Sequence, residues 1–334
     1  MTFPTKLYFR RIFRWNVLIS TELNLVMILI LSDKSDRHAD RVESILQKYA
    51  AEYSRLNLDV DSLKATQVRS EGDAFKIEGP NCCFSTSQIE TVWNRSSRME
   101  QVIEDNSIQN EVYLAWKEKW NKTLEGLFSS LESTKWLNFY GDFFIDNHFR
   151  QYSISKNIGL KWPSYICSND INYLNSFFET KRVRVLKLME QECKGRVELG
   201  CSTKCGDITN TLFFDQNMDG LCPVIGATYK VRCTVVGKEY FVGKICPPVQ
   251  SNSGVSVTRE SNYTVVQPPK SIKMRCIDIM TELNLTHGVF DFIVTKDDEW
   301  YFDALNPVGE YEWIEDITGS DIAASIAKWL MMHN

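Results

Sequence analysis

Histidine is scarce in this sequence, and the motifs of several common enzyme classes are missing from it. The four histidines stand at 38, 148, 287 and 333, a spread that predicts neither a histidine-based triad nor a histidine-rich metal site. No G-x-G-x-x-G follows an expected strand, and neither G-x-x-x-x-G-K-[ST] nor G-x-S-x-G occurs. These absences argue against a dinucleotide-binding fold, a P-loop nucleotidase and an α/β-hydrolase.

Neither the charge balance nor the cysteine content points to a nucleic-acid-binding or disulfide-rich protein. The sequence has 38 lysines and arginines against 43 aspartates and glutamates, so its net charge is −5 and we expect no nucleic-acid partner. Ten cysteines in 334 residues do not suggest a disulfide scaffold, and reduced thiols are the expected state. Cys201 and Cys205 in "CSTKC" match half of a metal site, but no second pair follows at zinc spacing.

Long hydrophobic runs are also missing. The run "LVMILIL" at 25–31 is too short to span a bilayer and predicts a buried strand instead. Residues 1–26 combine arginines with aromatic side chains, as in a targeting segment or a basic amphipathic helix. We interpret them as an extension of unsettled role, with the first domain beginning near Met27. We expect a cytoplasmic protein with no membrane partner.

The pattern along the chain predicts an α/β beginning followed by an α+β region. Residues 27–60 are expected to form strand, helix and strand, which is typical of a parallel or mixed sheet. Two hairpins are predicted at 229–245 and 288–307, because each has two β-rich runs joined by a turn sequence. A strand is expected at 182–189 and irregular structure at 194–222. Helices are expected at 99–133, 143–158 and 270–284 and at the C-terminus, and no internal repeat is present.

The second predicted hairpin carries side chains that suit a metal. Strand alternation puts Asp291 on one face of its strand, and Ala304 and Asn306 on one face of the partner strand. Carboxylate and amide oxygens are ligands that Mg²⁺ accepts, with substrate phosphates completing its shell. From the pattern alone the commoner role of an Asp and an Asn near strand ends is in turns, so both interpretations stay open.

The same region resembles a known family. "GVFDFIVTKDDEWYFDALNPVGEYEWIEDITGSDIAASIAKWL" resembles the C-terminal signature of ATP-grasp ligases, and more narrowly that of microviridin-type graspetide synthetases. Other segments line up with that family in order, from about residue 27 to residue 334. They are "MILILSDKSDRHADRV", "VWNRSS" (92–97), "WLN" (136–138), "NHFRQYSISKNIGLKWPSYICSND" (147–170), "VLKL" (185–188), "YKVRCTVVG" (229–237) and "VTR" (257–259).

The resemblance implies an ATP-grasp fold with an N-terminal pre-ATP-grasp α/β domain. The implied domains are 27–135, the pre-ATP-grasp domain with a helical segment, and 136–334, the ATP-grasp domain with two α+β lobes. The implied activity is an ATP- and Mg²⁺-dependent ligase. Such an enzyme activates a peptide side-chain carboxylate as an acyl phosphate and forms an intramolecular ester or amide. The implied partner is a ribosomal precursor peptide with a leader.

The resemblance also assigns roles to single residues. Lys187 and His148 match nucleotide-contacting positions, and a compact ammonium at 187 would suit a phosphate. Arg232 and Arg259 match arginines near the phosphates, where guanidinium groups stabilise developing charge. The implied Mg²⁺ ligands are Asp291 and Asn306. The alternatives are ordinary ones: Lys187 as a solvent-facing charge and Arg232 as an outward charge on a hairpin.

Several positions depart from the family pattern. Ala304 stands where a metal-binding Glu is expected, and Asp303 is expected to face the opposite side unless a β-bulge re-aims it. His148 stands where a lysine is expected, so the fixed charge is lost there. Lys230 replaces an acid. Two further departures are Glu310 in place of Gln and Val257 in place of Asp.

These departures leave three functions open. The first is the peptide macrocyclase, and the second is a catalytically impaired relative that binds or regulates a peptide. The third is an ATP-grasp ligase for a small amino acid or amine. A leader-binding surface is predicted in 112–140, around Trp116, Trp120 and Trp136, with plain core packing as the alternative. The peptide, the link type and the oligomeric state, with a homodimer as one option, are left open by the sequence.

Overall fold

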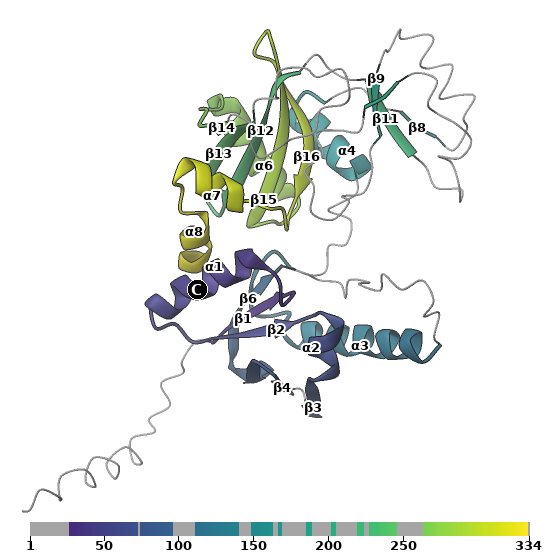
Figure 1. Cartoon of the computed structure of the whole chain (residues 1–334), viewed down its shortest axis with the longest axis vertical. Helices are drawn as coiled ribbons and strands as arrows, with labels where there is room; N and C mark the ends of the chain where they lie inside the picture. The colour runs from purple at the N-terminus through teal and green to yellow at the C-terminus, as the bar shows by residue number, and fades with distance from the viewer. Residues whose placement is uncertain are drawn as a thin grey trace, which may run out of the picture.

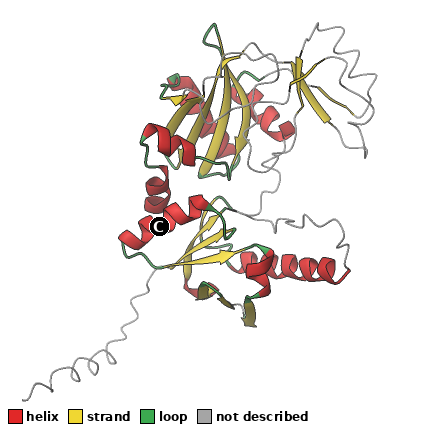
Figure 2. Cartoon of the chain, viewed as in Figure 1, coloured by secondary structure: helices red, strands yellow, loops and turns green. Residues whose placement is uncertain are grey.

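We describe the protein from a computed structural model (Figure 1). The structure describes residues 27–72, 74–95, 111–139, 148–162, 166–168, 185–188, 202–204, 219–223, 227–245 and 263–332. Within these ranges the chain is a mixed α/β protein, as predicted, with separate sheets in its N-terminal and C-terminal parts (Figure 2). No helix in this described part is both long and apolar enough to cross a membrane.

The N-terminal part is built on a parallel four-stranded sheet in the order β2-β1-β6-β7. The strand run "MILIL" is apolar throughout because β1 is covered on both faces. Helix α1 begins where the Asp36 carboxylate accepts hydrogen bonds from the backbone of His38 and Ala39. The predicted strand–helix–strand opening is therefore confirmed. The elements are β1 (Met27–Ser32), α1 (Arg37–Lys48), β2 (Tyr53–Asn57), β6 (Ile89–Asn94) and β7 (Lys135–Leu137).

A small antiparallel sheet and a long helix cover one face of this parallel sheet. Leu124, Leu127 and Phe128 of α3 pack in one apolar cluster with Leu29 and Leu31 of β1. The exposed side of α3 carries apolar side chains as well, such as Val112 at 73% exposure. The elements are α2 (Val60–Lys64), β3 (Gln67–Glu71), β4 (Ala74–Gly79), β5 (Cys82–Ser85), a 3₁₀ turn (Thr86–Gln88) and α3 (Glu111–Ser130).

The three tryptophans of the predicted leader surface belong to this same cluster. Trp136 is buried, and its indole donates a hydrogen bond to the Leu131 carbonyl over 2.8 Å. Trp116 and Trp120 are partly buried against the cluster. Core packing, the alternative raised from the sequence, accounts for Trp136, so it contributes structure rather than an accessible peptide contact.

The C-terminal part is built on a five-stranded antiparallel sheet in the order β14-β13-β12-β15-β16. Both predicted hairpins are present, β12–β13 and β15–β16. The first turns at Gly237, whose φ of 57° favours glycine. Phe290, Phe292 and Phe302 form the core on one face, covered by α4 and α6. The elements are α4 (His148–Ile158), β12 (Ala227–Val236), β13 (Glu239–Ile245), β14 (Tyr263–Thr264), α6 (Lys270–Glu282), β15 (His287–Thr295) and β16 (Trp300–Asn306).

A third, antiparallel sheet has the order β10-β9-β11-β8. Its strands are β8 (Ile166–Ser168), β9 (Val185–Leu188), β10 (Ser202–Lys204) and β11 (Asp219–Pro223). The strand expected at 182–189 is confirmed at β9. The expectation of irregular structure over 194–222 is wrong at β10 and β11, because both strands pair with β9 and pairing partners decide strand formation in polar segments.

The last two helices join the two parts of the protein. Helix α8 (Ile322–Met331) packs against α1 and follows α7 (Glu312–Thr318) (Figure 1). Lys135 of β7 caps the end of α8 by donating to the carbonyls of Trp329 and Met332. The N-terminal sheet and the C-terminal helices thus share one apolar cluster. It includes Ile28, Ile30, Val42, Leu46 and Trp93 from the first part and Ile314, Ile322, Ile326 and Leu330 from the second.

Candidate active site

The face of the five-stranded sheet opposite its phenylalanine core carries polar and charged side chains. Asp291 lies across from Arg232 on β12 and across from Ala304 on β16. Asn306 lies across from Val289, two positions before Asp291 on β15. Residues at such alternate positions share a face, so the register brings Arg232, Asp291, Ala304 and Asn306 together.

Arg232 and Asp291 form a two-pronged ion pair. The Arg232 Nε and Nη2 atoms each lie 2.8 Å from a different Asp291 carboxylate oxygen. The remaining Nη1 donates to the Glu310 carbonyl over 3.2 Å, and the guanidinium carbon lies 6.0 Å from the ring centre of Trp313. With only 11% of its side chain exposed, Arg232 is held on this face and does not project outward into solvent.

A β-bulge in β16 places Asp303 on this same face. Asp291 pairs with Ala304, but its neighbour Phe292 pairs with Phe302, so Asp303 is an extra residue in β16. The Asp303 carboxylate lies 3.2 Å from the Lys230 ammonium. Lys230 belongs to β12, the strand that also carries Arg232. The expectation that Asp303 faces away from the site is therefore wrong, because the added residue interrupts strand alternation.

Beyond β16 the chain turns at Asn306-Pro307. The Asn306 side-chain oxygen accepts a hydrogen bond from the Val308 backbone over 2.9 Å, so the amide closes a local turn. Gly309 must be small here, because a Cβ at this position would lie 2.7 Å from the Cβ of Val289. The turn thus keeps the Asn306 amide at the end of β16, close to the strand that carries Asp291.

The donor set of this face suits a hard cation. Asp291, Asp303 and Asn306 supply carboxylate and amide oxygens, which Mg²⁺ prefers, and one or two carboxylates with substrate phosphates are its usual protein environment. Arg232 and Lys230 counter the two carboxylates. Among the described residues no group of three or more His, Cys, Asp or Glu is arranged to hold a metal. By residue type these side chains suit a Mg²⁺ ion that shares its shell with a phosphate ligand, and in the described part of the chain they form no closed protein cage.

For the other predicted site residues the structure gives at most the position of the backbone. Lys187 lies in β9, where its backbone pairs with Ser202 and Cys222. His148 is the first residue of α4. Arg259 lies outside the described residues. The structure therefore places Asp291, Asn306 and Arg232 on one face, and the roles of all six residues stay predictions.

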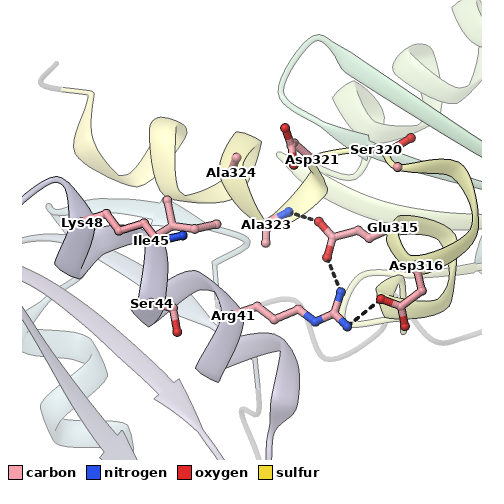
Figure 3. Close-up of a pocket in the computed structure, with 11 residues that line it drawn as sticks. Arg41, Ser44, Ile45, Lys48, Glu315, Asp316, Ser320, Asp321, Ala323 and Ala324 are labelled. Atoms are coloured by element: carbon pink, nitrogen blue, oxygen red, sulfur yellow. Dashed lines mark hydrogen bonds and ion pairs between the residues drawn. The ribbon is translucent and has the colours of Figure 1, made fainter.

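A separate cavity of about 330 Å³ lies between α1 and the α7–α8 turn (Figure 3). Arg41 crosses it and lies 3.0 Å from a Glu315 carboxylate oxygen and 2.8 Å from one of Asp316. Burial opposes its charge, but hydrogen bonds to these two acids raise the pKa of Arg41, so the guanidinium stays charged. Glu315 also accepts a hydrogen bond from the Ala323 backbone at the start of α8. These side chains satisfy one another, so they join the two parts of the protein.

Four side chains near the Asn-Pro turn were not predicted as site residues. Arg95 and Asn138 stand within the segments "VWNRSS" and "WLN", which the sequence marks only by resemblance. Asp36 likewise stands within "MILILSDKSDRHADRV", whereas His287 lies outside every segment that carries the resemblance. The structure shows that Arg95, Asn138 and His287 contact the turn directly and that Asp36 holds Arg95.

The protein thus combines a parallel sheet with an antiparallel sheet whose open face carries paired cations and carboxylates. Residues 27–143 match the family model of the MvdD pre-ATP-grasp domain. No curated protein matches the sequence. The resemblance to graspetide synthetases is thereby confirmed in this domain, and solved structures extend it to the whole fold.

Three solved structures show the likeness. Macrocyclase MdnB from Microcystis aeruginosa MRC superposes with a TM-score of 0.78 at 21% identity, covering 92% of this chain and 100% of that one. Macrocyclase MdnC from the same source, bound with precursor peptide MdnA, gives 0.77 at 21% identity and the same coverage. A Chryseobacterium gregarium RiPP-associated ATP-grasp ligase, in complex with ADP and a leader and core peptide, gives 0.74 at 23% identity, covering 91% and 96%. The chain therefore has the ATP-grasp fold of these ligases.

Proposed function

We propose that this protein is an ATP-dependent macrocyclase that forms an ester or amide between side chains of a ribosomal precursor peptide. The observation that carries the proposal is the group Arg232, Asp291, Asp303 and Asn306 on one face of an ATP-grasp sheet. Two of the similar structures are macrocyclases and one is a RiPP-associated ATP-grasp ligase, and solved complexes among them contain a precursor peptide, or ADP with a leader and core peptide. We place the reaction in the cytoplasm.

The proposed reaction has two steps, phosphorylation of a carboxylate and attack of a nucleophile on the acyl phosphate. A peptide carboxylate oxygen attacks the γ-phosphorus of ATP, the bond to the β,γ-bridging oxygen breaks, and ADP leaves. A serine or threonine hydroxyl, or a lysine amine, of the same peptide then attacks the acyl carbon. The carbon–oxygen bond to phosphate breaks, inorganic phosphate leaves, and the nucleophile loses its proton to solvent or phosphate. Holding both groups of one peptide together makes the second step effectively unimolecular.

The residues of the open face have separate roles in this proposal. Asp291, Asn306 and Asp303 would hold Mg²⁺, with Asp303 standing in for the carboxylate missing at Ala304. When bound, Mg²⁺ neutralises phosphate charge. Arg232, fixed by Asp291, presents a positive charge where negative charge develops during phosphoryl transfer. The roles proposed for Lys187, His148 and Arg259 are contacts to the nucleotide and its phosphates.

The experiment that tests this function is calorimetric titration of the full chain with ATP, with and without Mg²⁺. We expect Mg²⁺-dependent binding that Lys187→Ala weakens, because this variant removes the proposed phosphate contact. Binding by the wild type would justify a search for peptides that lose one water per ring. Absence of nucleotide binding in the wild type would refute the proposal.

A second candidate is a catalytically impaired relative that binds a peptide. The observation in its favour is Ala304, which leaves the position opposite Asp291 without a carboxylate, while Arg232 engages both Asp291 oxygens. Ala304→Glu separates the candidates in the same titration. Nucleotide binding that appears only in this variant identifies a silenced site, whereas binding by the wild type favours the macrocyclase.

A further inference from the structure

The turn that follows β16 is held by hydrogen bonds from side chains that lie elsewhere in the sequence. The Asn306 amide oxygen accepts from the Val308 nitrogen, so the orientation of the amide depends on the peptide unit between Pro307 and Val308. The carbonyl of that unit belongs to Pro307, and the next carbonyl belongs to Val308. Side chains from elsewhere in the chain bind both carbonyls.

Asn138 binds the first of these carbonyls. It directly follows β7 of the N-terminal sheet, is buried, and has a φ of 64°, a conformation that asparagine tolerates better than most residues. Its Nδ2 donates to Pro307 O over 2.9 Å and to His287 O over 2.8 Å. Its Oδ1 accepts from the Thr286 and His287 nitrogens over 3.0 and 2.9 Å. One amide thus ties the start of β15 to the turn after β16.

His287 provides a second donor to the same carbonyl. Its Nδ1 lies 2.9 Å from Pro307 O, and because a carbonyl only accepts, Nδ1 carries the hydrogen. Burial lowers the pKa of His287 to about 4, so the ring is neutral at physiological pH and donates as that tautomer.

Arg95 binds the second carbonyl. Its Nη1 donates to Val308 O over 2.7 Å, and its Nε lies 2.9 Å from an Asp36 carboxylate oxygen. Both side chains are nearly buried, at 8% and 11% exposure. Asp36 also caps α1, so the guanidinium is anchored to the N-terminal part of the protein. Breaking such a pair is costly, because it would leave a buried charge unpaired.

We propose that Asn138 and Arg95 are positioning residues: from the ends of strands of the N-terminal sheet they fix the turn that presents the Asn306 amide oxygen to Mg²⁺. This inference rests on the proposed function, since it assumes that Asn306 is a metal ligand. Neither residue would touch the γ-phosphate of ATP or the peptide carboxylate. Both act through adjacent carbonyls of one turn, so residues next to the N-terminal sheet complete a site whose proposed ligands lie on the C-terminal sheet.

The experiment measures Mn²⁺ binding, as a spectroscopic probe for Mg²⁺, to the full chain with ATP present, using electron paramagnetic resonance. Arg95→Lys keeps a positive charge beside Asp36. An ammonium lacks the planar, several-donor geometry of a guanidinium, so it cannot bind Asp36 and the Val308 carbonyl at the same time. Asn138→Ala removes all four hydrogen bonds of the amide, the two that it donates and the two that it accepts. We expect each variant to raise the Mn²⁺ Kd about tenfold. A tenfold change is the effect expected when about one strong hydrogen bond that orients the ligand is lost. The double variant should raise it less than the product of the two, because both residues hold one turn.

Arg55→Lys is the matched control. Arg55 is also 8% exposed, also lies in the N-terminal domain, and also pairs with carboxylates of α1, Asp40 and Glu43. We expect it to lower the melting temperature as Arg95→Lys does and to leave the Mn²⁺ Kd unchanged. Equal Mn²⁺ affinity in wild type, Arg95→Lys and Asn138→Ala would overturn the positioning role alone. Absence of Mn²⁺ binding in the wild type would overturn the proposed function, and the positioning role with it.

Discussion

The proposed ligand role of Asp303 leads to a prediction about metal affinity. Substituting one partner of its ion pair should lower this affinity, and substituting the other should raise it. The pair joins Asp303 to Lys230 over 3.2 Å. Asp303→Asn removes a proposed metal ligand and keeps the shape of the side chain. Lys230→Met removes the cation that competes with the metal for that carboxylate and keeps most of the apolar stem.

The magnitudes follow from burial. The side chains of Asp303 and Lys230 are 9% and 21% exposed, so each single variant removes an opposite charge from beside a mostly desolvated group. A fully buried pair would cost about 3–5 kcal/mol to break in this way, and the partial exposure of Lys230 reduces the expected loss to about 1–3 kcal/mol. For metal binding, loss of an outer-shell partner already costs about 10–100-fold, so loss of a direct carboxylate ligand should cost at least about tenfold.

Two assays on the same samples separate stability from metal affinity. Urea unfolding gives the free energy of unfolding, which both single variants should lower. Mn²⁺ titration with ATP present gives the metal affinity, which Asp303→Asn should lower and Lys230→Met should raise. A structural ion pair with no metal role predicts lower stability and unchanged Mn²⁺ affinity in both variants. Unchanged affinity in Asp303→Asn would therefore refute the ligand role.

Two further predictions concern pH and packing. Burial lowers the pKa of His38 to about 3 and that of His287 to about 4, so the unfolded chain, with pKa values near 6.5, takes up more protons on acidification. The free energy of unfolding should therefore fall as pH decreases from about 6.5 to 4, and urea titrations of His38→Gln should show a shallower fall; equal slopes in variant and wild type would contradict this. Gly309→Ala should lower the free energy of unfolding by about 1–3 kcal/mol, because its Cβ would lie 2.7 Å from Val289, whereas Gly126→Ala on a helix should not lower it. Equal stability of these two glycine variants in thermal unfolding would contradict the packing argument.

Local patterns were enough to predict much of the fold. The strand–helix–strand opening, both antiparallel hairpins and the C-terminal helix follow from periodicity and turn residues, and all are present. The placement of Asp291 on the same sheet face as Ala304 and Asn306 follows from alternation in the same way. These features depend on residues close in sequence, where the side-chain period of a strand or helix is a direct signal.

The features that were missed depend on contacts between distant residues. The bulge at Asp303 inserts one residue into a strand whose composition is ordinary, so neither glycine nor proline marks it. The contacts of Arg95 and Asn138 span 213 and 169 positions along the chain, and no local pattern reports the partner of a buried polar group. The strands at 202–204 and 219–223 likewise depend on β9, which lies earlier in the chain.

The shared apolar cluster between β1 and α8 has a consequence for the order of folding during synthesis. Ile28 and Ile30 belong to the first described strand, whereas Ile326 and Leu330 belong to the last helix, and all four are buried together. While the ribosome translates the intervening residues, this face of the first sheet has cover from α1 but none from α8. We expect the N-terminal domain to remain in a partly formed state that chaperones recognise until α8 emerges and docks.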